Sequence, residues 1–446
     1  MRIGWKDLRA LARRRVPGQV VIQMTDRCNA RCPQCEMRVT EKFTRTDSSL
    51  DEMKRTVDAA AAKGFSVLSF TGGEPLLFLD QVVELLHHAG RAGLRYLRTG
   101  TNGYLFARPE APGWERRVRE VAEKLAGSPI RNFWISVDSA VPEVHERMRG
   151  FKGLWSGIER AVPIFHEYGL YPSANLGLNR NIGGDDTWDL STAAGTESEP
   201  AYLEEFYRRF RDALDLFYRR VTSMGFTIVN CCYPMSVDEV AAPSGLQAVY
   251  AATSADRIVR FHDRERAELF RALFDTIPSH RPHLRIFSPR TTLHSMVQRY
   301  TGVESGSQYG CRGGIDFFFV NARDGNTYPC GYRGNENLGK LWDLDLATTA
   351  GPATCRDCDW ECWRDPSELF GPVLEGIGSP LALYRHWQSD RRYFELWKED
   401  LRYYRACEFF DGRRPPNFDR LRRFGEPPRA TPTVTPKAAT AIPSRL

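Results

Sequence analysis

The chain has 446 residues, of which 42% are hydrophobic and 26% are charged, and its formal net charge is +6. This length allows two or three globular units with buried cores. No apolar run approaches the roughly 20 residues of a membrane-spanning helix, the basic residues 1–16 lack the apolar segment of a secretory signal, and basic residues alternate with acidic ones elsewhere. We therefore expect a cytoplasmic protein, with no membrane insertion and with nucleic-acid binding disfavoured.

Three of the eleven cysteines lie in one short turn. Cys28, Cys32 and Cys35 follow the apolar run at residues 20–24, which predicts a strand. Cubane iron–sulfur clusters are normally held by four thiolates, so a group of three implies either a distant fourth ligand or an iron open to another molecule. A zinc site, or three unrelated thiols, is the alternative.

Strands and helices alternate after this turn. Strands are expected at residues 20–24, 66–70, 95–98, 132–137, 171–178 and 226–232, and helices at residues 49–64, 80–92, 114–125, 154–168 and 203–224. This alternation predicts an α/β fold with a parallel sheet, arranged as a partial (β/α)6 barrel of the TIM type.

Polar turns follow five of the predicted strands at their carboxyl ends, where parallel α/β folds bind ligands. They are the cysteine turn, Gly72-Gly73-Glu74-Pro75, Thr101-Asn102, Ser136 with Asp138, and residues 175–179. The two glycines allow close approach of the backbone to a ligand. Exposed carbonyls, with the Glu74 carboxylate, would suit a primary ammonium group. Each turn alone could equally be an ordinary connection or a helix cap.

The cysteine turn and the glycine turn together resemble the radical S-adenosylmethionine (SAM) superfamily, over roughly residues 18–285. The resemblance implies a 4Fe–4S cluster on Cys28, Cys32 and Cys35 whose open iron chelates SAM. Reductive cleavage, with an electron donor such as a flavodoxin or ferredoxin, would yield a 5′-deoxyadenosyl radical that abstracts hydrogen from the substrate. The implied SAM contacts are Gly72, Gly73, Glu74 and Pro75 for the methionine amine, Thr101, Asn102, Ser136 and Asp138 for the ribose side, Arg149 for the carboxylate, and Gln34, in place of the family's usual aromatic residue, for the adenine side.

A second cysteine group lies in the last third of the chain. A turn at residues 323–326 predicts a β-hairpin that brings Cys311 and Cys330 together, and Cys355, Cys358 and Cys362 follow. With Asp324-Gly325, Tyr328-Pro329 and Leu338-Gly339 in this order, the set resembles the SPASM domain or its shortened twitch form. The resemblance implies one auxiliary 4Fe–4S cluster on four of the five cysteines, with Cys362 the least favoured; a structural zinc is the alternative.

Two thiols and a polar segment are candidates for contact with a substrate. Cys231 and Cys232 end the sixth predicted strand, so one of them points inward and could donate a hydrogen atom to a substrate radical, as in radical epimerases; a small core residue is the alternative. Residues 181–200 are expected to form a loop over the open edge, a substrate lid. The further candidate substrate contacts are Asn179, Arg180, Asp185, Asp186, Tyr233, His145 and Glu146.

These features divide the chain into an N-terminal extension (1–17), the barrel (18–285), the auxiliary-cluster domain (286–370), a helical C-terminal segment (371–430) and a disordered tail (431–446). Because only a short segment precedes the barrel, we expect a small-molecule substrate. The cysteine turn and the polar lid are similar to those of members that dehydrate, dehydrogenate or epimerise sugars in aminoglycoside antibiotic biosynthesis, which favours an amino sugar. The alternatives are maturation of a ribosomally made peptide and, in another class, a non-catalytic metal-binding scaffold.

Overall fold

The computed structural model describes residues 5–35, 45–191, 199–235, 246–250, 256–303, 309–349 and 351–425. Seven consecutive strands pair in parallel, each with the next along the chain. They are β1 (Gln19–Thr25), β2 (Val67–Gly72), β3 (Tyr96–Thr101), β4 (Ile130–Ser136), β5 (Ser173–Gly177), β6 (Ile228–Cys232) and β7 (Arg285–Phe287). The predicted α/β class with a parallel sheet is confirmed. β7 is not among the strands expected from the sequence, because its three residues carry little periodicity.

Two further strands extend the sheet beyond β1. β8 (Phe317–Val320) runs parallel to β1, and β9 (Thr327–Tyr328) is antiparallel to β8. The order in the nine-stranded sheet is β7-β6-β5-β4-β3-β2-β1-β8-β9. The hairpin expected from the second cysteine group is present, and its first strand satisfies the backbone groups at the edge of β1.

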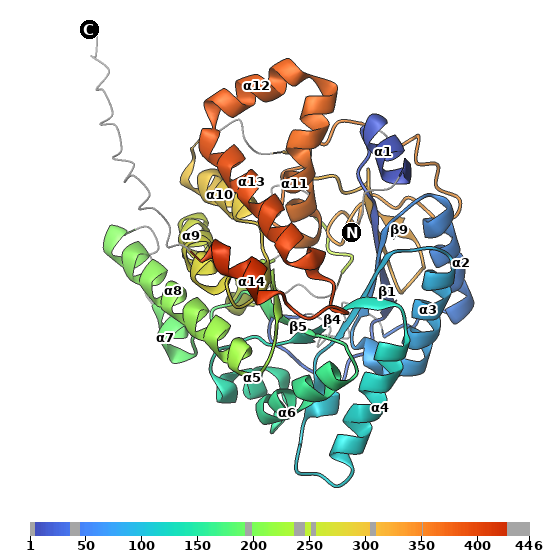
Figure 1. The fold of residues 1–446 in the computed structure, drawn as a ribbon, viewed down its shortest axis with the longest axis vertical. Coiled ribbons are helices and arrows are strands. Elements are labelled where there is room, and N and C mark those ends of the chain that lie inside the picture. Colours follow the sequence, from blue (N-terminus) through green and yellow to red (C-terminus); the bar gives the residue numbers. More distant parts are fainter. Residues whose placement is uncertain are drawn as a thin grey trace.

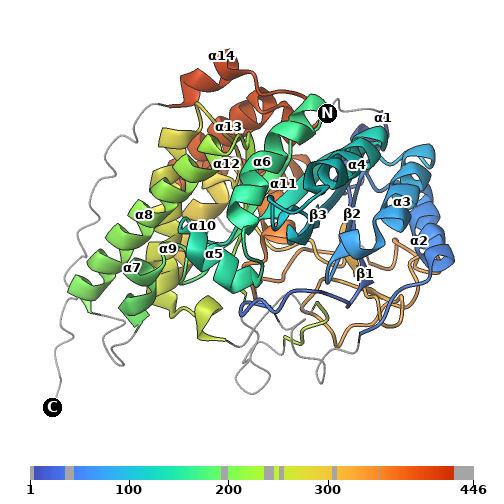
Figure 2. The same ribbon diagram turned by 90° about the horizontal axis from the view of Figure 1, so that it is seen from below.

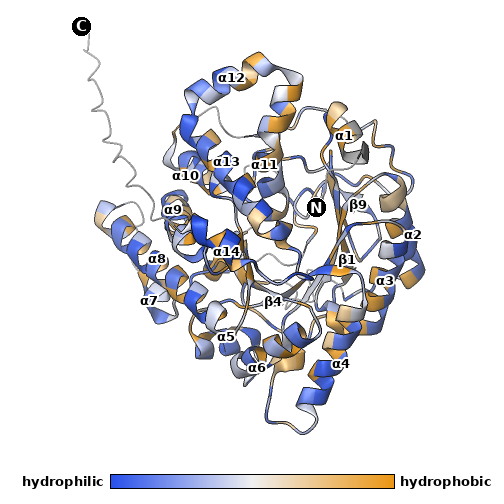
Figure 3. Ribbon diagram, viewed as in Figure 1, coloured by the Kyte–Doolittle hydropathy of each residue, from blue (hydrophilic) through white to orange (hydrophobic). Residues whose placement is uncertain are grey.

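Helices pack against the outer face of this sheet (Figure 1). They are α2 (Leu50–Ala62), α3 (Leu79–Arg91), α4 (Trp114–Gly127), α6 (Leu154–Glu167), α8 (Pro200–Ser223), α9 (Asp263–His280) and α10 (Arg290–Thr301). Ser49 begins α2 as the sequence predicts, because its side chain accepts a hydrogen bond from the Glu52 N–H. Leu68 and Phe70 of β2 join these helices in the main hydrophobic core. Figure 3 shows the corresponding pattern, with mixed polar and apolar stretches on α4 and α8 and a largely hydrophobic β1.

The inner face of the sheet is more polar, because side chains alternate along each strand. Ser69 of β2 lies beside Arg98 of β3 in the register of the two strands. In the same way Ser136, Asn175 and Asn230 form a row across β4, β5 and β6. A polar inner face is what a barrel that binds a ligand inside requires.

The C-terminal segment lies against this inner face at the amino ends of the strands. It consists of α11 (Glu361–Gly378), α12 (Pro380–Ser389), α13 (Arg391–Ala406) and α14 (Phe418–Leu421), and the N-terminal α1 (Trp5–Ala12) contacts α11. Ile228 of β6 shares a small core with Tyr403 and Phe410, and the Tyr96 hydroxyl donates to the Phe410 carbonyl at 2.8 Å. In Figure 2, α14 lies at the upper edge, away from the segment that follows β1. The carboxyl ends of the strands are thus left to the cysteine turns.

The segment at residues 181–200 differs from the predicted loop. Residues 185–191 form the short helix α7 (Asp185–Trp188) and a 3₁₀ turn (Asp189–Ser191), and Thr187 on α7 is buried. Asp185 and Asp186 are exposed to solvent. Residues 192–198 and the predicted tail at 431–446 lie outside the described residues.

Among the described helices, none has both the length and the apolar composition needed to cross a membrane.

Candidate active site

The first cysteine group lies in the loop that leaves the carboxyl end of β1, and the turn after β2 holds this loop in place. The Gly73 N–H donates to the Thr25 carbonyl at 2.7 Å, and the Glu74 N–H donates to the Arg27 carbonyl at 2.8 Å. A Cβ atom on Gly73 would lie 2.0 Å from the Arg27 carbonyl oxygen. The glycines therefore allow two backbone turns to touch, a role beyond the close approach to a ligand that the sequence indicates.

The Glu74 carboxylate points away from the open edge, contrary to the sequence analysis. Its side chain is completely buried. It accepts hydrogen bonds from the Leu76 N–H at 3.0 Å, the Thr101 hydroxyl at 2.8 Å and the Asn102 N–H at 2.6 Å. Burial raises the pKa of Glu74 to about 7. Glu74 and Thr101 thus fix the turn that follows β3, and only the backbone carbonyls of the glycine turn remain as acceptors for an amine.

Two side chains from neighbouring turns reach the cysteine loop. Asn102 Nδ2 lies 3.7 Å from Cys28 Sγ, and Arg149 Nη1 lies 3.6 Å from Cys32 Sγ. Arg149 ends α5 (Pro142–Arg149) and forms a two-point ion pair with Asp138, at 2.5 and 2.8 Å. Burial raises the pKa of Cys32 to about 11, and the Arg149 charge opposes that rise. In this geometry Asp138, expected on the ribose side, orients Arg149 beside the cysteine loop.

Four cysteines of the second group come together. The Cys311 N–H donates to the Cys355 carbonyl at 2.8 Å. Burial, followed by the charges of Cys358, Cys311 and Cys355, raises the pKa of the Cys330 thiol. Backbone N–H groups lie 3.4 Å from Cys311 Sγ and from Cys330 Sγ. Hydrogen bonds of this kind tune thiolates that hold iron–sulfur clusters.

Cys362 points elsewhere. Its thiol donates to the adjacent Glu361 carboxylate at 3.4 Å, and the next charged neighbour that acts on it is Arg98 of β3. The Tyr250 hydroxyl, which bonds Thr71 of β2 at 3.0 Å, lies near both Cys35 and Cys362. Cys362 is therefore grouped with Glu361 and with Arg98 of β3.

The alternation at the end of β6 settles which thiol faces inward. Cys231 points outward, 3.7 Å from the Tyr218 hydroxyl of α8, and is 1% exposed. Cys232 points inward, with its Sγ 3.4 Å from Asn175 Nδ2, and it keeps part of its surface accessible. Burial, followed by the Glu361 charge, raises the pKa of Cys232 well above its usual value. Of the two candidates, only Cys232 is placed to meet a substrate.

Most of the other candidate substrate contacts have structural partners. Asn179 donates to the Asp138 carbonyl at 2.8 Å, and Arg180 forms a buried ion pair with Glu265 at 2.6 Å. The Glu146 carboxylate accepts from the N–H groups of Gly153 and Trp155, which begin α6.

The side chains of His145 and Tyr233 also have hydrogen-bond partners within the protein. The Asp138 N–H donates to His145 Nδ1 at 3.2 Å, and burial lowers the pKa of His145 to about 4. The Tyr233 hydroxyl donates to Asp365 at 3.3 Å. Asp185 and Asp186 are exposed on α7. The remaining predicted residues are held by structural partners: Asn179, Glu146 and His145 by backbone groups, and Arg180 and Tyr233 by buried carboxylates.

Sequence reasoning missed Glu361, Arg98 and Tyr250. The sequence does contain an indication for Glu361, since this residue lies beside Cys362 in the second cysteine group. Arg98 follows the apolar pair Tyr96-Leu97 in its strand, which is a weaker indication. Tyr250 had none, because it follows a segment without periodicity.

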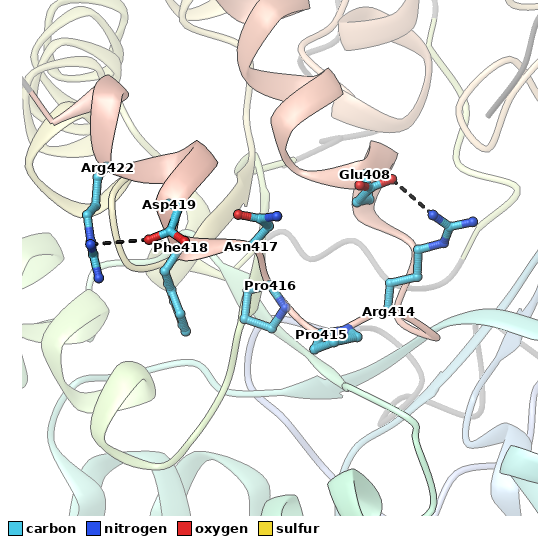
Figure 4. A pocket seen from close by; sticks show the side chains of 8 residues that line it. All are labelled: Glu408, Arg414, Pro415, Pro416, Asn417, Phe418, Asp419 and Arg422. Atoms are coloured by element: carbon cyan, nitrogen blue, oxygen red, sulfur yellow. Dashed lines mark hydrogen bonds and ion pairs between the residues drawn. The ribbon is translucent and has the colours of Figure 1, made fainter.

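A hollow on the surface of the C-terminal segment is separate from all of these residues (Figure 4). It is lined by Glu408, Arg414, Pro415, Pro416, Asn417, Phe418, Asp419 and Arg422. No cysteine and no other predicted site residue lines it.

Comparison with known proteins identifies the first two fifths of the chain. Residues 22–189 match the family model of the Radical SAM superfamily. Residues 22–189 thus match a radical SAM domain, over less than half of the chain. That domain contains the Cys28 loop, the glycine turn and Arg149.

The chain is similar to several characterised proteins, and each match covers a different share of it. The AdoMet-dependent heme synthase of Methanosarcina barkeri is 24% identical over 323 residues, 72% of this chain and 79% of the synthase. The GTP 3′,8-cyclase of Desulforamulus reducens is 31% identical over 164 residues, 35% of this chain, and the match spans only 47% of the cyclase. The solved structure of native anSMEcpe with bound AdoMet is 15% identical, covers 85% of this chain and 99% of that chain, and has a TM-score of 0.48.

A radical SAM domain implies a 4Fe–4S cluster that binds SAM, and the residues after β1 fit this group. The Ala30 N–H lies 3.4 Å from Cys28 Sγ, adding a third N–H donor to those of Asn102 and Arg149. Gln34 Oε1 is buried and, within the described ranges, lacks a hydrogen-bond partner, so it can accept from a ligand. In the same ranges no three His, Cys, Asp or Glu side chains converge closely enough to bind a single metal ion. The thiolates that hold a cubane cluster surround four irons and four sulfides, so they lie farther apart than the ligands of a single metal ion.

Proposed function

We propose that this chain is a radical SAM enzyme that removes a hydrogen atom from a small polar molecule held at the inner face of the sheet. The observation that carries the proposal is the cysteine loop, which the Gly73 and Glu74 N–H groups fix to the carboxyl edge of the sheet, near the Tyr250 hydroxyl. When bound, the cluster and SAM supply a 5′-deoxyadenosyl radical that abstracts hydrogen.

The residues around the loop are proposed to bind SAM. Carbonyls of Gly72 and Gly73 accept from the methionine amine, and Arg149, held by Asp138, meets the methionine carboxylate. Asn102 and Ser136 face the ribose side, and Gln34 Oε1 accepts from the adenine. Glu74 and Thr101 act as positioning residues, because their side chains are occupied by the turn itself.

Cys311, Cys330, Cys355 and Cys358 are proposed to hold one auxiliary 4Fe–4S cluster. The four thiols influence one another's pKa values, and two of them receive backbone N–H groups. Cys362 is left out of this set because its neighbours are Glu361 and Arg98. An external electron donor, a flavodoxin or a ferredoxin, is proposed as the partner.

The substrate is proposed to be an amino sugar or a related polyol. Hydroxyl and amide side chains on the inner face, among them Ser69, Thr71 and Asn175, suit a molecule with many hydroxyl groups. For an epimerising outcome, Cys232 is the hydrogen-atom donor. Its S–H bond breaks homolytically as the new C–H bond forms, and the resulting thiyl radical regains the thiol by taking one electron from the external donor and one proton from solvent.

The test is anaerobic incubation of reduced, iron-loaded protein with SAM and candidate amino sugars. We expect 5′-deoxyadenosine together with a product that has lost water, lost two hydrogens, or kept its mass in H2O while gaining one deuterium in D2O. The Cys28→Ala variant should make no 5′-deoxyadenosine.

Two outcomes would overturn the proposal. Purified protein that contains zinc but neither iron nor sulfide would favour the metal-binding scaffold. Turnover that requires a co-encoded peptide, with no reaction on sugars, would favour peptide maturation.

A further inference from the structure

Arg98 is a cation on the inner face of β3. Its neighbours along the strand face outward: Leu97 belongs to the main core, and the Thr99 hydroxyl donates to the Phe70 carbonyl at 3.0 Å. Arg98 keeps part of its surface accessible, so it is not sealed in the core. The strand thus presents a guanidinium group to the interior of the barrel.

This guanidinium lacks the partners that interior charges normally have. Arg98 Nε is buried and has no hydrogen-bond partner among the described residues, and in those ranges Arg98 forms no ion pair. Ser69, its neighbour in register, is 4% exposed, and its hydroxyl also has no partner there. Two adjacent unpaired polar groups cost stability. Such a cost is expected where a ligand completes the hydrogen bonds.

Trp134 fixes one side of the same site. Its indole ring lies over Gly100, where an added Cβ atom would be 2.1 Å from the ring. Glycine at this position therefore lets the ring lie flat on β3. The Arg98 guanidinium carbon lies 5.5 Å from the ring centroid, which limits the directions in which its N–H groups point.

The site adjoins the residues proposed for catalysis. Arg98 and Glu361 both act on the thiol of Cys362. Cys232 in turn lies beside Glu361. A ligand with a negative group would be attracted to Arg98 and repelled by Glu361, so it could bind in one orientation only.

We infer that Arg98, with the Ser69 hydroxyl and the Trp134 ring, binds an anionic oxygen group of the substrate, a carboxylate or a phosphate. A planar guanidinium with free N–H groups matches the two oxygens of either group. The inference rests on the proposed function, whose substrate it narrows to a polyol or amino sugar that also carries an acid group. The competing explanation is that Arg98 only stabilises a Cys362 thiolate.

The test uses two simple anions in place of the substrate. Binding of inorganic phosphate and of acetate to the full-length, iron-loaded protein without SAM is measured by titration calorimetry. The variants are Arg98→Met, Arg98→Lys and Ser69→Ala, and the control is Arg91→Met, at an exposed position on α3.

We expect Arg98→Met to weaken anion binding by roughly 10- to 100-fold, as hydrogen bonds to charged groups do when one partner is lost. Arg98→Lys keeps the positive charge but loses the paired N–H donors of the guanidinium, so its anion affinity should lie between those of the wild type and Arg98→Met. The affinity of Arg91→Met should match that of the wild type. The anion that binds with the higher affinity indicates whether the acid group of the substrate is a phosphate or a carboxylate. The melting temperature of Arg98→Met should equal or exceed that of the wild type, because an unpaired charge is removed.

The inference is overturned if neither anion binds to the wild-type protein, or if Arg98→Met binds anions as the wild type does, whether or not its melting temperature falls. Should Arg98→Met not fold, wild-type anion binding by both Arg98→Lys and Ser69→Ala would overturn it. The titration needs neither SAM nor turnover. A wild-type protein that binds phosphate through Arg98 but makes no 5′-deoxyadenosine would therefore contradict the proposed function and leave the anion site standing.

Discussion

At Gly73 the backbone of the turn after β2 touches the backbone of the cysteine loop. The contact is closer than any other residue allows, since a Cβ atom would lie 2.0 Å from the Arg27 carbonyl oxygen and 3.0 Å from the Cys28 nitrogen. The position of Cys28 thus depends on the absence of one methyl group.

Gly73→Ala should therefore displace the cysteine loop. We expect a loss of about 1–3 kcal/mol in the free energy of unfolding, the range for overpacking, and lower iron occupancy after reconstitution. Gly127→Ala is the control, because Gly127 lies in α4 with open space around its Cα. Equal iron content in the two variants would show that the contact does not control the loop.

Cys358 and Cys362 are four residues apart but have different surroundings. Cys358 lies with Cys311 and Cys330, whereas Cys362 bonds Glu361. Cys358→Ala should lower the iron content by about four atoms per chain, one cubane, and Cys362→Ala should leave it unchanged. Iron and acid-labile sulfide analysis checks this, and equal losses in both variants would make Cys362 a ligand.

At the scale of elements, α11 is the helix that joins the cysteine groups to the C-terminal segment. It begins with Glu361 beside Cys232, and Trp363 donates to the Pro329 carbonyl of the hairpin at 3.1 Å. Farther along, Glu368 accepts from the Tyr393 hydroxyl of α13 at 3.0 Å. One helix therefore connects the hairpin, β6 and α13.

The link from α11 to α13 should depend on pH. Burial, opposed by Arg364, raises the pKa of Glu368 from 4.5 to about 7. Between these values the folded protein holds a proton that the unfolded chain has lost, so the free energy of unfolding falls as pH rises from about 4.5 to 7, by roughly 3 kcal/mol.

Glu368→Gln should remove this contribution, because the amide keeps an acceptor for Tyr393 and does not ionise. Urea unfolding at a series of pH values checks the prediction. Glu395→Gln, at an exposed position on α13, is the control. A pH profile of Glu368→Gln that parallels the wild type would contradict the assignment.

At the scale of the whole molecule, the C-terminal segment is part of the barrel's structure. Asp400 of α13 and Arg281, which follows α9, are both completely buried and pair at 2.5 Å. Asp400 also accepts from the N–H and the hydroxyl of Thr291, at the start of α10. Because these contacts join three helices, α9, α10 and α13 should unfold together.

Asp400→Ala should destabilise the protein by about 3–5 kcal/mol, the range for a buried charge left without its partner. Glu167→Ala, which breaks an exposed pair with Arg119, should cost less than about 1 kcal/mol. Chemical unfolding followed by circular dichroism measures both. If Asp400→Ala shifted only a separate, smaller unfolding transition and left the main one unchanged, the C-terminal segment would unfold independently of the barrel.

Local patterns predicted much of this protein. Strand and helix alternation gave the parallel sheet, and Ser49 marked the start of α2, because periodicity and capping act over a few residues. The placement of loop side chains was predicted less well. Asn179 and Glu146 are polar and near the right edge, but each satisfies a nearby backbone group instead of facing inward.

The sequence by itself determined where the cysteines lie along the chain, that three of them follow the first strand, and that a glycine turn follows the second. Only the tertiary structure decided that Cys232 and not Cys231 faces inward, that Glu74 is turned into the protein, and that Cys362 stands apart from the other four cysteines of its group. The physical reason is distance along the chain. These outcomes depend on the turn after β3 meeting Glu74, on the register of β5 with β6, and on α11 packing against β6. The contacts join residues 28 to 128 positions apart in the chain, which short-range patterns do not encode.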